Sequence, residues 1–149
     1  MKKGNVHIDN EMTLADEETV VRGLRSFNET WIGSSNEQPV RLVARDAEGV
    51  VGGLLGHTKW KWLYVAKLWV DERGRGQGIG TQLLTAAEEL ARRRGCTDAS
   101  LDTFEYQARP FYEKLGYELF GTLDGYPPGY RQFYLRKRLG ERSGDPLKE

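Results

Sequence analysis

The 149-residue sequence predicts a single α/β domain built around a β-α-β unit. Three observations predict this class. A strand-like apolar run at residues 64–70 leads into a glycine-rich turn at residues 74–80. A long amphipathic helix, residues 79–94, starts within that turn, and a second strand-like run follows at residues 99–104. Two strands joined by a helix in this order pair in parallel and bind ligands at the carboxyl end of the first strand.

Composition limits the partners that this chain is expected to have. Lysine plus arginine and aspartate plus glutamate number 22 each, so no global field attracts nucleic acid or an anionic membrane. No apolar run reaches membrane-spanning length and no signal peptide opens the chain, which predicts a cytoplasmic protein. The single cysteine, Cys96, excludes an intrachain disulfide and a cysteine metal site, and its place after a helix predicts a small core residue. No metal is expected.

The N-terminal part predicts a strand, a helix and a hairpin in that order. The alternating run at residues 6–8 predicts a short first strand. Residues 14–30 carry apolar side chains at helical spacing from Val20 onward, and acidic residues lie where they favour a helix start. Residues 40–45 and 50–55 are strand-like runs around a turn-forming segment, which is typical of a β-hairpin.

The central part contains the β-α-β unit. Residues 57–62 are polar and aromatic and predict the next connection, whereas residues 64–70 are apolar enough for a central strand. In the helix at residues 79–94 the apolar side chains share one face, and Gly95 follows at the place where glycine commonly ends a helix. Residues 99–104 predict the second parallel strand.

The C-terminal part predicts a short helix and an antiparallel pair of strands. Residues 108–115 have apolar side chains at helical spacing, with a proline in the first turn. Residues 117–122 and 130–139 predict two strands around a Pro-Gly-aromatic loop. The last ten residues, 140–149, are polar and predict a disordered tail. We therefore expect one domain over residues 1–149.

The glycine-rich turn predicts an anion site. Gly74, Gly76, Gly78 and Gly80 occupy alternate positions and leave one side of the curve without side chains. Backbone N–H groups and the positive end of the helix dipole can then converge on a phosphate or pyrophosphate. A flexible connector is the alternative, although glycine is costly to order. The turn lacks the lysine of a P-loop, and Ile79 replaces the third glycine of the dinucleotide fingerprint.

Two sequence blocks together carry a family resemblance. The turn contains Arg75-x-x-Gly78-x-Gly80, and residues 108–117 read Ala-Arg-Pro-Phe-Tyr-Glu-Lys-Leu-Gly-Tyr. With both blocks at this separation, the chain strongly resembles the Gcn5-related N-acetyltransferase family over about residues 40–139, and in outline before them. The resemblance implies a single domain with a mixed twisted sheet of about six to seven strands, helices on both faces and a central coenzyme-binding β-α-β unit.

The resemblance implies that acetyl-coenzyme A is the acetyl donor and that backbone amides of residues 75–80 hold its pyrophosphate. In the family, the strand ending here at residues 68–70 splays from the next parallel strand, often at a β-bulge, and pantetheine lies in the notch. A backbone N–H near Val70 would polarise the thioester carbonyl. Gln107 stands where many members have an asparagine that bonds the pantetheine arm. The implied coenzyme-binding residues are Leu68, Trp69, Val70, Arg73, Arg75, Gly76, Gln77, Gly78, Ile79, Gly80, Gln107 and Tyr112.

By the same resemblance, Tyr112 is the expected general acid. In the family, the tyrosine four residues before the glycine of the second block protonates the leaving thiolate, and an ordinary phenol pKa of about 10 suits that role. A packed aromatic ring is the alternative. The amine must also lose a proton, and the candidate bases are Asp102, Glu105, Asp71, Glu72 and His57. Asp102 is the nominal choice, while a base acting through water would leave no sequence signature.

The acceptor is expected to be a small-molecule amine, attacked directly in a ternary complex because no cysteine is placed to carry the acetyl group. Exposed aromatic residues predict the walls of its pocket, although they could equally form a dimer contact or core. These residues are Trp60, Trp62, Tyr126 and Tyr130. A protein lysine or N-terminus is the second choice. The rival functions are an acyl-coenzyme A sensor without turnover and a nucleotide-binding interaction domain, and a homodimer, common in the family, is compatible with the sequence.

Overall fold

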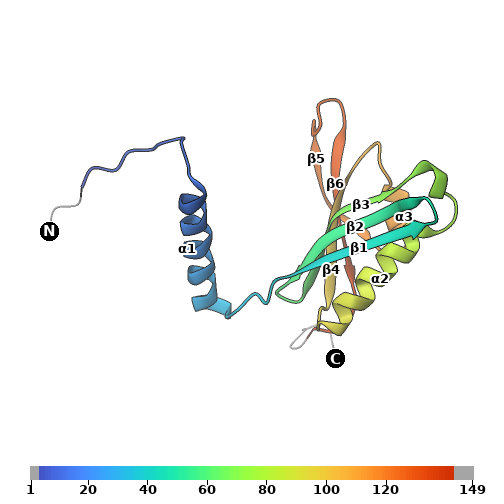
Figure 1. Cartoon of the computed structure of the whole chain (residues 1–149), viewed down its shortest axis with the longest axis horizontal. Helices are drawn as coiled ribbons and strands as arrows, with labels where there is room; N and C mark the ends of the chain where they lie inside the picture. The colour runs from blue at the N-terminus through green and yellow to red at the C-terminus, as the bar shows by residue number, and fades with distance from the viewer. Residues whose placement is uncertain (1–3, 143–149) are drawn as a thin grey trace. The chain divides into compact units, whose positions relative to one another are not determined.

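The computed structural model describes residues 4–142, which form two compact units, one ending at Ser35 and the other starting at Asn36 (Figure 1). The elements are α1 (Leu14–Ile32), β1 (Gln38–Asp46), β2 (Gly49–Lys59), β3 (Trp62–Val70), the 3-10 turn η1 (Glu72–Gly74), α2 (Ile79–Arg93), β4 (Asp98–Phe104), α3 (Arg109–Lys114), β5 (Glu118–Asp124) and β6 (Arg131–Arg138). The expected tail at residues 140–149 lies mostly outside the described residues. A single domain over the whole chain stays a prediction.

Helix α1 of the N-terminal unit confirms the helix predicted from residue 14. It begins with a capping box, in which the Thr13 hydroxyl accepts from the Asp16 amide at 3.1 Å and the Asp16 carboxylate accepts from the Thr13 amide at 3.0 Å. It ends before Gly33, whose φ of 77° stops the helix. The predicted first strand at residues 6–8 is wrong. Residues 4–9 form no strand, because residues 4–35 contain no second strand with which their backbone groups could pair.

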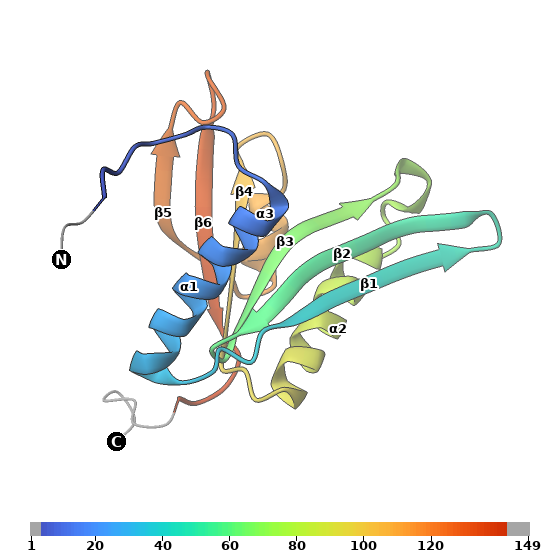
Figure 2. The ribbon, with the colours of Figure 1, turned by 60° about the vertical axis from the view of Figure 1, so that its left-hand side comes forward.

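The second unit is built on a mixed sheet with the strand order β1-β2-β3-β4-β6-β5 (Figure 2). Strands β3 and β4 pair in parallel, and the other neighbouring strands pair antiparallel. Helix α2 connects the two parallel strands, as expected for a β-α-β unit. The α/β class, the mixed sheet and its central unit are therefore confirmed, with six strands among the described residues.

One face of this sheet packs against α2 and α3. Its core cluster draws on the sheet and both helices, and the fully buried members include Leu54, Leu63, Leu84, Ala87 and Ala91. Burying each such leucine contributes about 1.5–3 kcal/mol. Tyr112 of α3 and Cys96 after α2 belong to the same cluster, so the small core residue predicted at Cys96 is confirmed. We call the opposite sheet face the second face; that a helix covers it stays a prediction.

The connection between β2 and β3 is shorter than the sequence indicates. Residues 57–62 were expected to link the strands, but β2 continues to Lys59 and β3 starts at Trp62. Only Trp60 and Lys61 form the turn, with φ values of 48° and 64°. Two-residue hairpins favour such positive φ values, and glycine or asparagine normally supplies them. The prediction was wrong because tryptophan and lysine give no turn signal.

Strand β3 contains a β-bulge next to the point where its pairing with β4 ends. Its register with β2 shifts between Leu55 and Gly56, because Leu55 pairs with Lys67 and Gly56 with Val65, which leaves Ala66 as an extra residue. On the other side of β3, parallel pairing with β4 covers only residues 62–65 and ends at Val65 and Leu101. Beyond that point β3 and β4 separate. The β-bulge and the splayed strands implied by the family resemblance are both present.

Candidate active site

The splayed ends of β3 and β4 open into a cleft of about 720 Å³. Its walls come from the end of β3 at residues 68–70, the glycine turn and start of α2, and the segment from Tyr106 to Tyr112. All predicted coenzyme-binding residues except Arg73 and Gln77 line this cleft. Sequence reasoning missed further lining residues, namely Gly74, Thr81, Tyr106, Ala108 and Phe111. Four of these, all but Tyr106, belong to the two motif blocks or directly adjoin them, so proximity to the motifs was the available signal.

The glycine turn has the backbone geometry of an anion site. Gly76 and Gly78 have φ values of 79° and 75°, which side chains rarely tolerate. Gly78 is the N-cap of α2 and provides no side-chain acceptor, so the first N–H groups of the helix remain available to a ligand. A Cβ at Gly80 would lie 3.2 Å from the Phe111 ring, so this glycine also lets α3 approach the turn closely. The residues present therefore fit a pyrophosphate.

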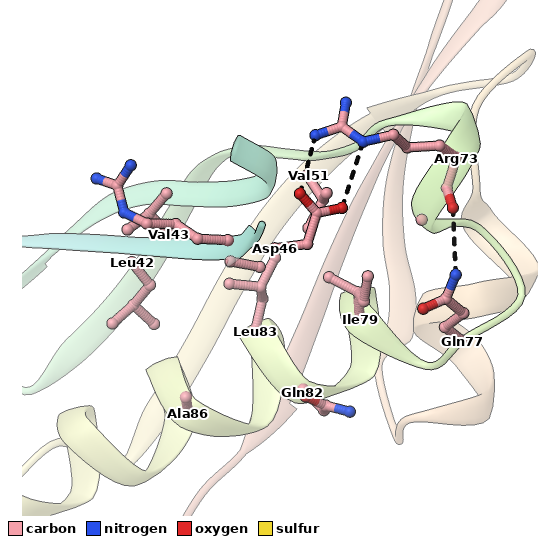
Figure 3. Close-up of a pocket in the computed structure, with 13 residues that line it drawn as sticks. Leu42, Val43, Asp46, Val51, Arg73, Gln77, Ile79, Gln82, Leu83 and Ala86 are labelled. Carbon is pink, nitrogen blue, oxygen red and sulfur yellow. Dashed lines mark hydrogen bonds and ion pairs between the residues drawn. The ribbon is translucent and has the colours of Figure 1, made fainter. Parts of the chain in front are cut away.

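The two predicted residues outside the cleft lie together on the far side of the turn (Figure 3). There, Arg73 pairs with Asp71 at 2.9 Å and with Asp46 at 3.4 Å, and donates to the Val50 carbonyl at 3.1 Å. Gln77 donates to the Arg73 carbonyl at 3.1 Å. Both residues border a separate pocket of about 430 Å³ between β1 and α2. Arg73 thus ties the turn to the β1–β2 hairpin.

Arg75 lies on the cleft side of the turn, unlike Arg73. It lines the cleft, and its Nε donates to the Val70 carbonyl at 3.4 Å. Of the two arginines considered for the donor phosphates, the structure brings Arg75 to the cleft and directs Arg73 to the hairpin carboxylates. The sequence could not separate them, because they are two residues apart in one turn and both are charged.

Tyr112 lies on α3 and is only 8 % exposed. Its ring packs edge-on against Phe111 and Tyr117, with centroids 5.1 and 6.1 Å away. Burial, together with the nearby charge of Asp102, raises the pKa of Tyr112 above its ordinary value. The phenol is therefore protonated at neutral pH. A protonated phenol on the wall of the cleft suits the donor of a proton to a leaving thiolate.

A buried carboxylate anchors the segment that follows Tyr112. Glu88 of α2 accepts from the Tyr117 hydroxyl at 2.8 Å and pairs with Lys137 of β6 at 2.9 Å. The Tyr117 amide in turn donates to the Tyr112 carbonyl at 3.1 Å. These bonds tie the segment that follows α3 to α2 and to β6, next to Tyr112.

The Gln107 side chain bonds the last two residues of β4. Its amide oxygen accepts from the Thr103 hydroxyl at 3.0 Å and from the Phe104 amide at 2.7 Å. The side chain lines the cleft, and the oxygen is committed to the protein. The NH₂ group is the part of Gln107 that can bond a ligand there.

Asp102 lies on the second face, since its neighbours Leu101 and Thr103 are buried and Leu101 belongs to the core cluster with α2. Its carboxylate accepts from the Tyr64 hydroxyl at 2.7 Å and from the Gln132 amide at 3.1 Å. The other candidate bases differ in their partners. Glu105 pairs with Arg131 at 2.7 Å, Asp71 pairs with Arg73 at 2.9 Å, and the His57 ring packs against Tyr64.

The predicted acceptor-binding aromatic residues lie in two different places. Trp60 and Trp62 are at the start of β3, at the opposite end of that strand from the cleft. Tyr126 and Tyr130, in the β5–β6 turn, join an aromatic group at the end of β4 that sequence reasoning missed. Its ring contacts are Phe104–Tyr106 at 5.8 Å, Phe104–Tyr126 at 5.7 Å and Tyr106–Tyr130 at 5.0 Å. Tyr106 also lines the cleft, so this group borders the cleft.

Two general features concern metals and membranes. Among the described residues, no group of three or more histidine, cysteine, aspartate or glutamate side chains is arranged to hold a metal ion. No helix in residues 4–142 combines the length and the apolar character needed to cross a membrane.

Comparison with known proteins agrees with this geometry. The sequence matches the acetyltransferase (GNAT) family over residues 9–117. It is 43 % identical to blasticidin-S acetyltransferase of Streptomyces morookaense over 68 % of this chain and 79 % of that protein. It is 40 % identical to an acetyltransferase of Agrobacterium fabrum over 84 % of this chain and 93 % of the relative. The crystal structure of an acetyltransferase from Bacillus cereus superposes with a TM-score of 0.81 at 34 % identity, over 89 % of this chain and 97 % of that one. The chain belongs to the GNAT family and is an acetyltransferase.

Proposed function

We propose that this enzyme transfers the acetyl group of acetyl-coenzyme A to the amine of a small molecule by direct attack in a ternary complex. The observation that carries the proposal is the cleft itself. In it, a splayed strand end, an uncapped helix start and a protonated phenol meet within about 720 Å³. These are the groups that a thioester attached to a pyrophosphate requires.

The donor is held by backbone groups. The amides of residues 76–80 bind its pyrophosphate, since the Arg75 amide already donates to the Glu72 carbonyl, and the Arg75 side chain adds a positive charge at the cleft. Because β3 loses its β4 partner beyond Val65, the strand edge at residues 68–70 is available to the pantetheine arm. The N–H near Val70 stabilises the negative charge that develops on the thioester oxygen.

The chemistry then needs three proton movements. The acceptor ammonium gives one proton to a base, and its nitrogen lone pair attacks the thioester carbon. The carbon–sulfur bond breaks with its electron pair on sulfur, and Tyr112 donates its proton to that sulfur. The new amide nitrogen gives its second proton to the Tyr112 phenolate. The products are the acetylated amine, coenzyme A as a thiol, and one proton released to solvent.

The position of the cysteine supports direct attack over an acetylated cysteine intermediate. Cys96 is the only cysteine of the chain, and it is buried in the core after α2. Burial also raises its pKa, so it is a poor nucleophile. A small-molecule acceptor is supported by the relative named for blasticidin S, which covers two thirds of this chain at 43 % identity. A protein lysine or N-terminus is the second candidate for the acceptor.

The experiment is an amine panel with acetyl-coenzyme A, read as release of free thiol. The panel holds blasticidin S, alkylamines, an amino sugar and a lysine peptide. We expect thiol release with at least one small amine and the matching acetylated product by mass spectrometry. Binding of acetyl-coenzyme A without thiol release from any amine would favour the acyl-coenzyme A sensor instead. A cytoplasmic location and a homodimer stay predictions, and light scattering tests the second.

A further inference from the structure

Asp102 differs in its partners from the other carboxylates that the second unit shields from solvent. Glu88 and Asp98 are buried, and they pair with Lys137 at 2.9 Å and with Arg142 at 2.7 Å. Asp71 is half-buried and pairs with Arg73. Asp102 is also half-buried, yet no lysine or arginine among the described residues of the second unit forms an ion pair with it. Within the described part of the second unit, this carboxylate therefore has no cationic partner.

Two neutral side chains bond Asp102, and both donate a hydrogen bond to its carboxylate. The Tyr64 hydroxyl donates to one carboxylate oxygen at 2.7 Å, and the Gln132 amide donates to the other at 3.1 Å. The Gln132 side chain is buried, with 7 % exposed, and its own oxygen accepts from the Tyr134 hydroxyl at 2.9 Å. This network fixes the carboxylate in place. An ionised carboxylate offers about four acceptor sites, so two sites stay open to a ligand that donates hydrogen bonds.

The Tyr64 hydroxyl is protonated in this network. Burial and the hydrogen bond to Asp102 raise the pKa of Tyr64 to about 12, so its hydroxyl is a donor at neutral pH. Tyr64 and Gln132 each direct one proton at Asp102, so the carboxylate oxygens remain acceptors for further donors. A ligand with N–H donors and a positive charge completes it.

Asp102 also has a particular place in the fold. It directly follows Leu101, the last residue of β4 that pairs with β3, so it stands where the two strands separate. Its charge raises the pKa of Tyr112, which lines the cleft. The carboxylate therefore lies on the second face at the inner end of the notch, where the pairing of β3 with β4 ends.

We propose that Asp102 binds the acceptor amine as its ammonium form, and that Tyr64 and Gln132 are positioning residues that aim the two carboxylate oxygens. The proposal rests on the proposed function, since the bound ammonium must then lose a proton to attack. An N–H bond of the ammonium breaks, its proton moves to a carboxylate oxygen of Asp102, and nitrogen keeps the electron pair. The acid later returns this proton to solvent. The acceptors selected are small amines that are protonated at neutral pH.

The direct test is an NMR titration of the ¹⁵N-labelled full chain with butylammonium and with 1-butanol, a neutral molecule of the same size. We expect butylammonium to shift the backbone amides of residues 102–104 and 132–134, and butanol to leave them in place. Asp102→Asn should abolish the response. Glu118→Gln removes another carboxylate from the second unit and should keep it. Equal shifts with both probes, or an unchanged response in Asp102→Asn, would overturn the proposal.

Tyr64→Phe tests the positioning role. We expect the Kd for butylammonium to rise about fivefold, as for the loss of one hydrogen bond, while the Kd for acetyl-coenzyme A stays unchanged. With an active amine, KM for the amine should rise more than kcat falls. A merely structural role would weaken both ligands together and lower the unfolding midpoint, and that result would contradict positioning.

The two proposals fail in different ways. If the chain is a sensor, no amine releases thiol, but butylammonium still perturbs the amides around Asp102. If the ammonium site is wrong, an amine releases thiol, and Asp102→Asn leaves its KM unchanged.

Discussion

Gly56 of β2 lies directly against the carbonyl oxygen of Tyr64 in β3. A Cβ atom at Gly56 would overlap that oxygen and would lie 3.2 Å from the Cα of Val65. The close approach occurs where β3 carries its extra residue, Ala66, and beside the last pair between β3 and β4. A missing side chain on β2 therefore permits the bulge beyond which the two parallel strands separate.

Gly56→Ala is expected to destabilise the protein by about 3 kcal/mol, because the atoms in the way belong to the backbone and cannot turn aside. Urea unfolding measures the loss. Gly121→Ala is the matched control on another strand, since its Cβ would lie 3.7 Å from Tyr134, an ordinary contact distance. A Gly56→Ala protein as stable as the wild type would show that β3 can shift at little cost.

Tyr112→Phe is expected to lower kcat by about a hundredfold and to leave the Kd for acetyl-coenzyme A unchanged, because it removes only the proton for the thiolate. Steady-state kinetics and calorimetry measure the two quantities. Tyr117→Phe removes a neighbouring buried hydroxyl, which bonds Glu88, and should lower stability while reducing kcat far less than Tyr112→Phe, because the Tyr112 hydroxyl is kept. Full turnover in Tyr112→Phe would assign the acid elsewhere.

Gly78→Ala and Gly95→Ala form a pair with the same backbone strain. Their φ values are 75° and 85°, and a Cβ at either would meet no atom within 4 Å. Each substitution should cost about 1 kcal/mol of stability. Only Gly78 borders the cleft, so only Gly78→Ala should also raise the Kd for acetyl-coenzyme A, by about tenfold. Equal ligand affinity in both variants would remove the turn from the donor site.

Arg75→Ala and Arg73→Ala should separate the two arginines of the turn. We expect Arg75→Ala to weaken acetyl-coenzyme A about fivefold, because a cation leaves the cleft. Arg73→Ala breaks the ties to Asp46 and Asp71, and should lower the unfolding midpoint with little change in affinity. The opposite order of affinities would mean that Arg73 turns toward the phosphates when the donor binds.

Asp98 predicts a pH dependence of stability. Burial acts to raise the pKa of Asp98, but hydrogen bonds from Arg142 and Thr97 outweigh it and hold the pKa below its usual range. Because the unfolded pKa is about 3.9, this stabilisation is complete above about pH 4 and is lost as pH falls through the folded pKa. The free energy of unfolding of wild type should exceed that of Asp98→Asn at neutral pH, and the difference should shrink below about pH 4. A difference that stays constant down to acid pH would contradict the paired carboxylate.

Local pattern was enough to predict most of the fold. Helix α2 and the β-α-β unit depend on apolar periodicity and on glycines at fixed spacing, which act within a few residues. The two failures, the strand at residues 6–8 and the connection at residues 57–62, have local causes as well. A strand exists only with a partner, and the turn at Trp60 and Lys61 lacks the residues that usually mark one.

The candidate site likewise has a part that the sequence predicted and a part that depends on tertiary structure. By itself the sequence predicted the donor side, because backbone amides at a glycine turn and Tyr112 on a motif helix are tied to contiguous residues. Only the tertiary structure decided where the strands part, that Arg73 faces the hairpin, and that Asp102 meets Tyr64 and Gln132. Those relationships join residues 27 to 38 positions apart. Strand register and side-chain packing bring such residues together, and neither is encoded within a short window of sequence.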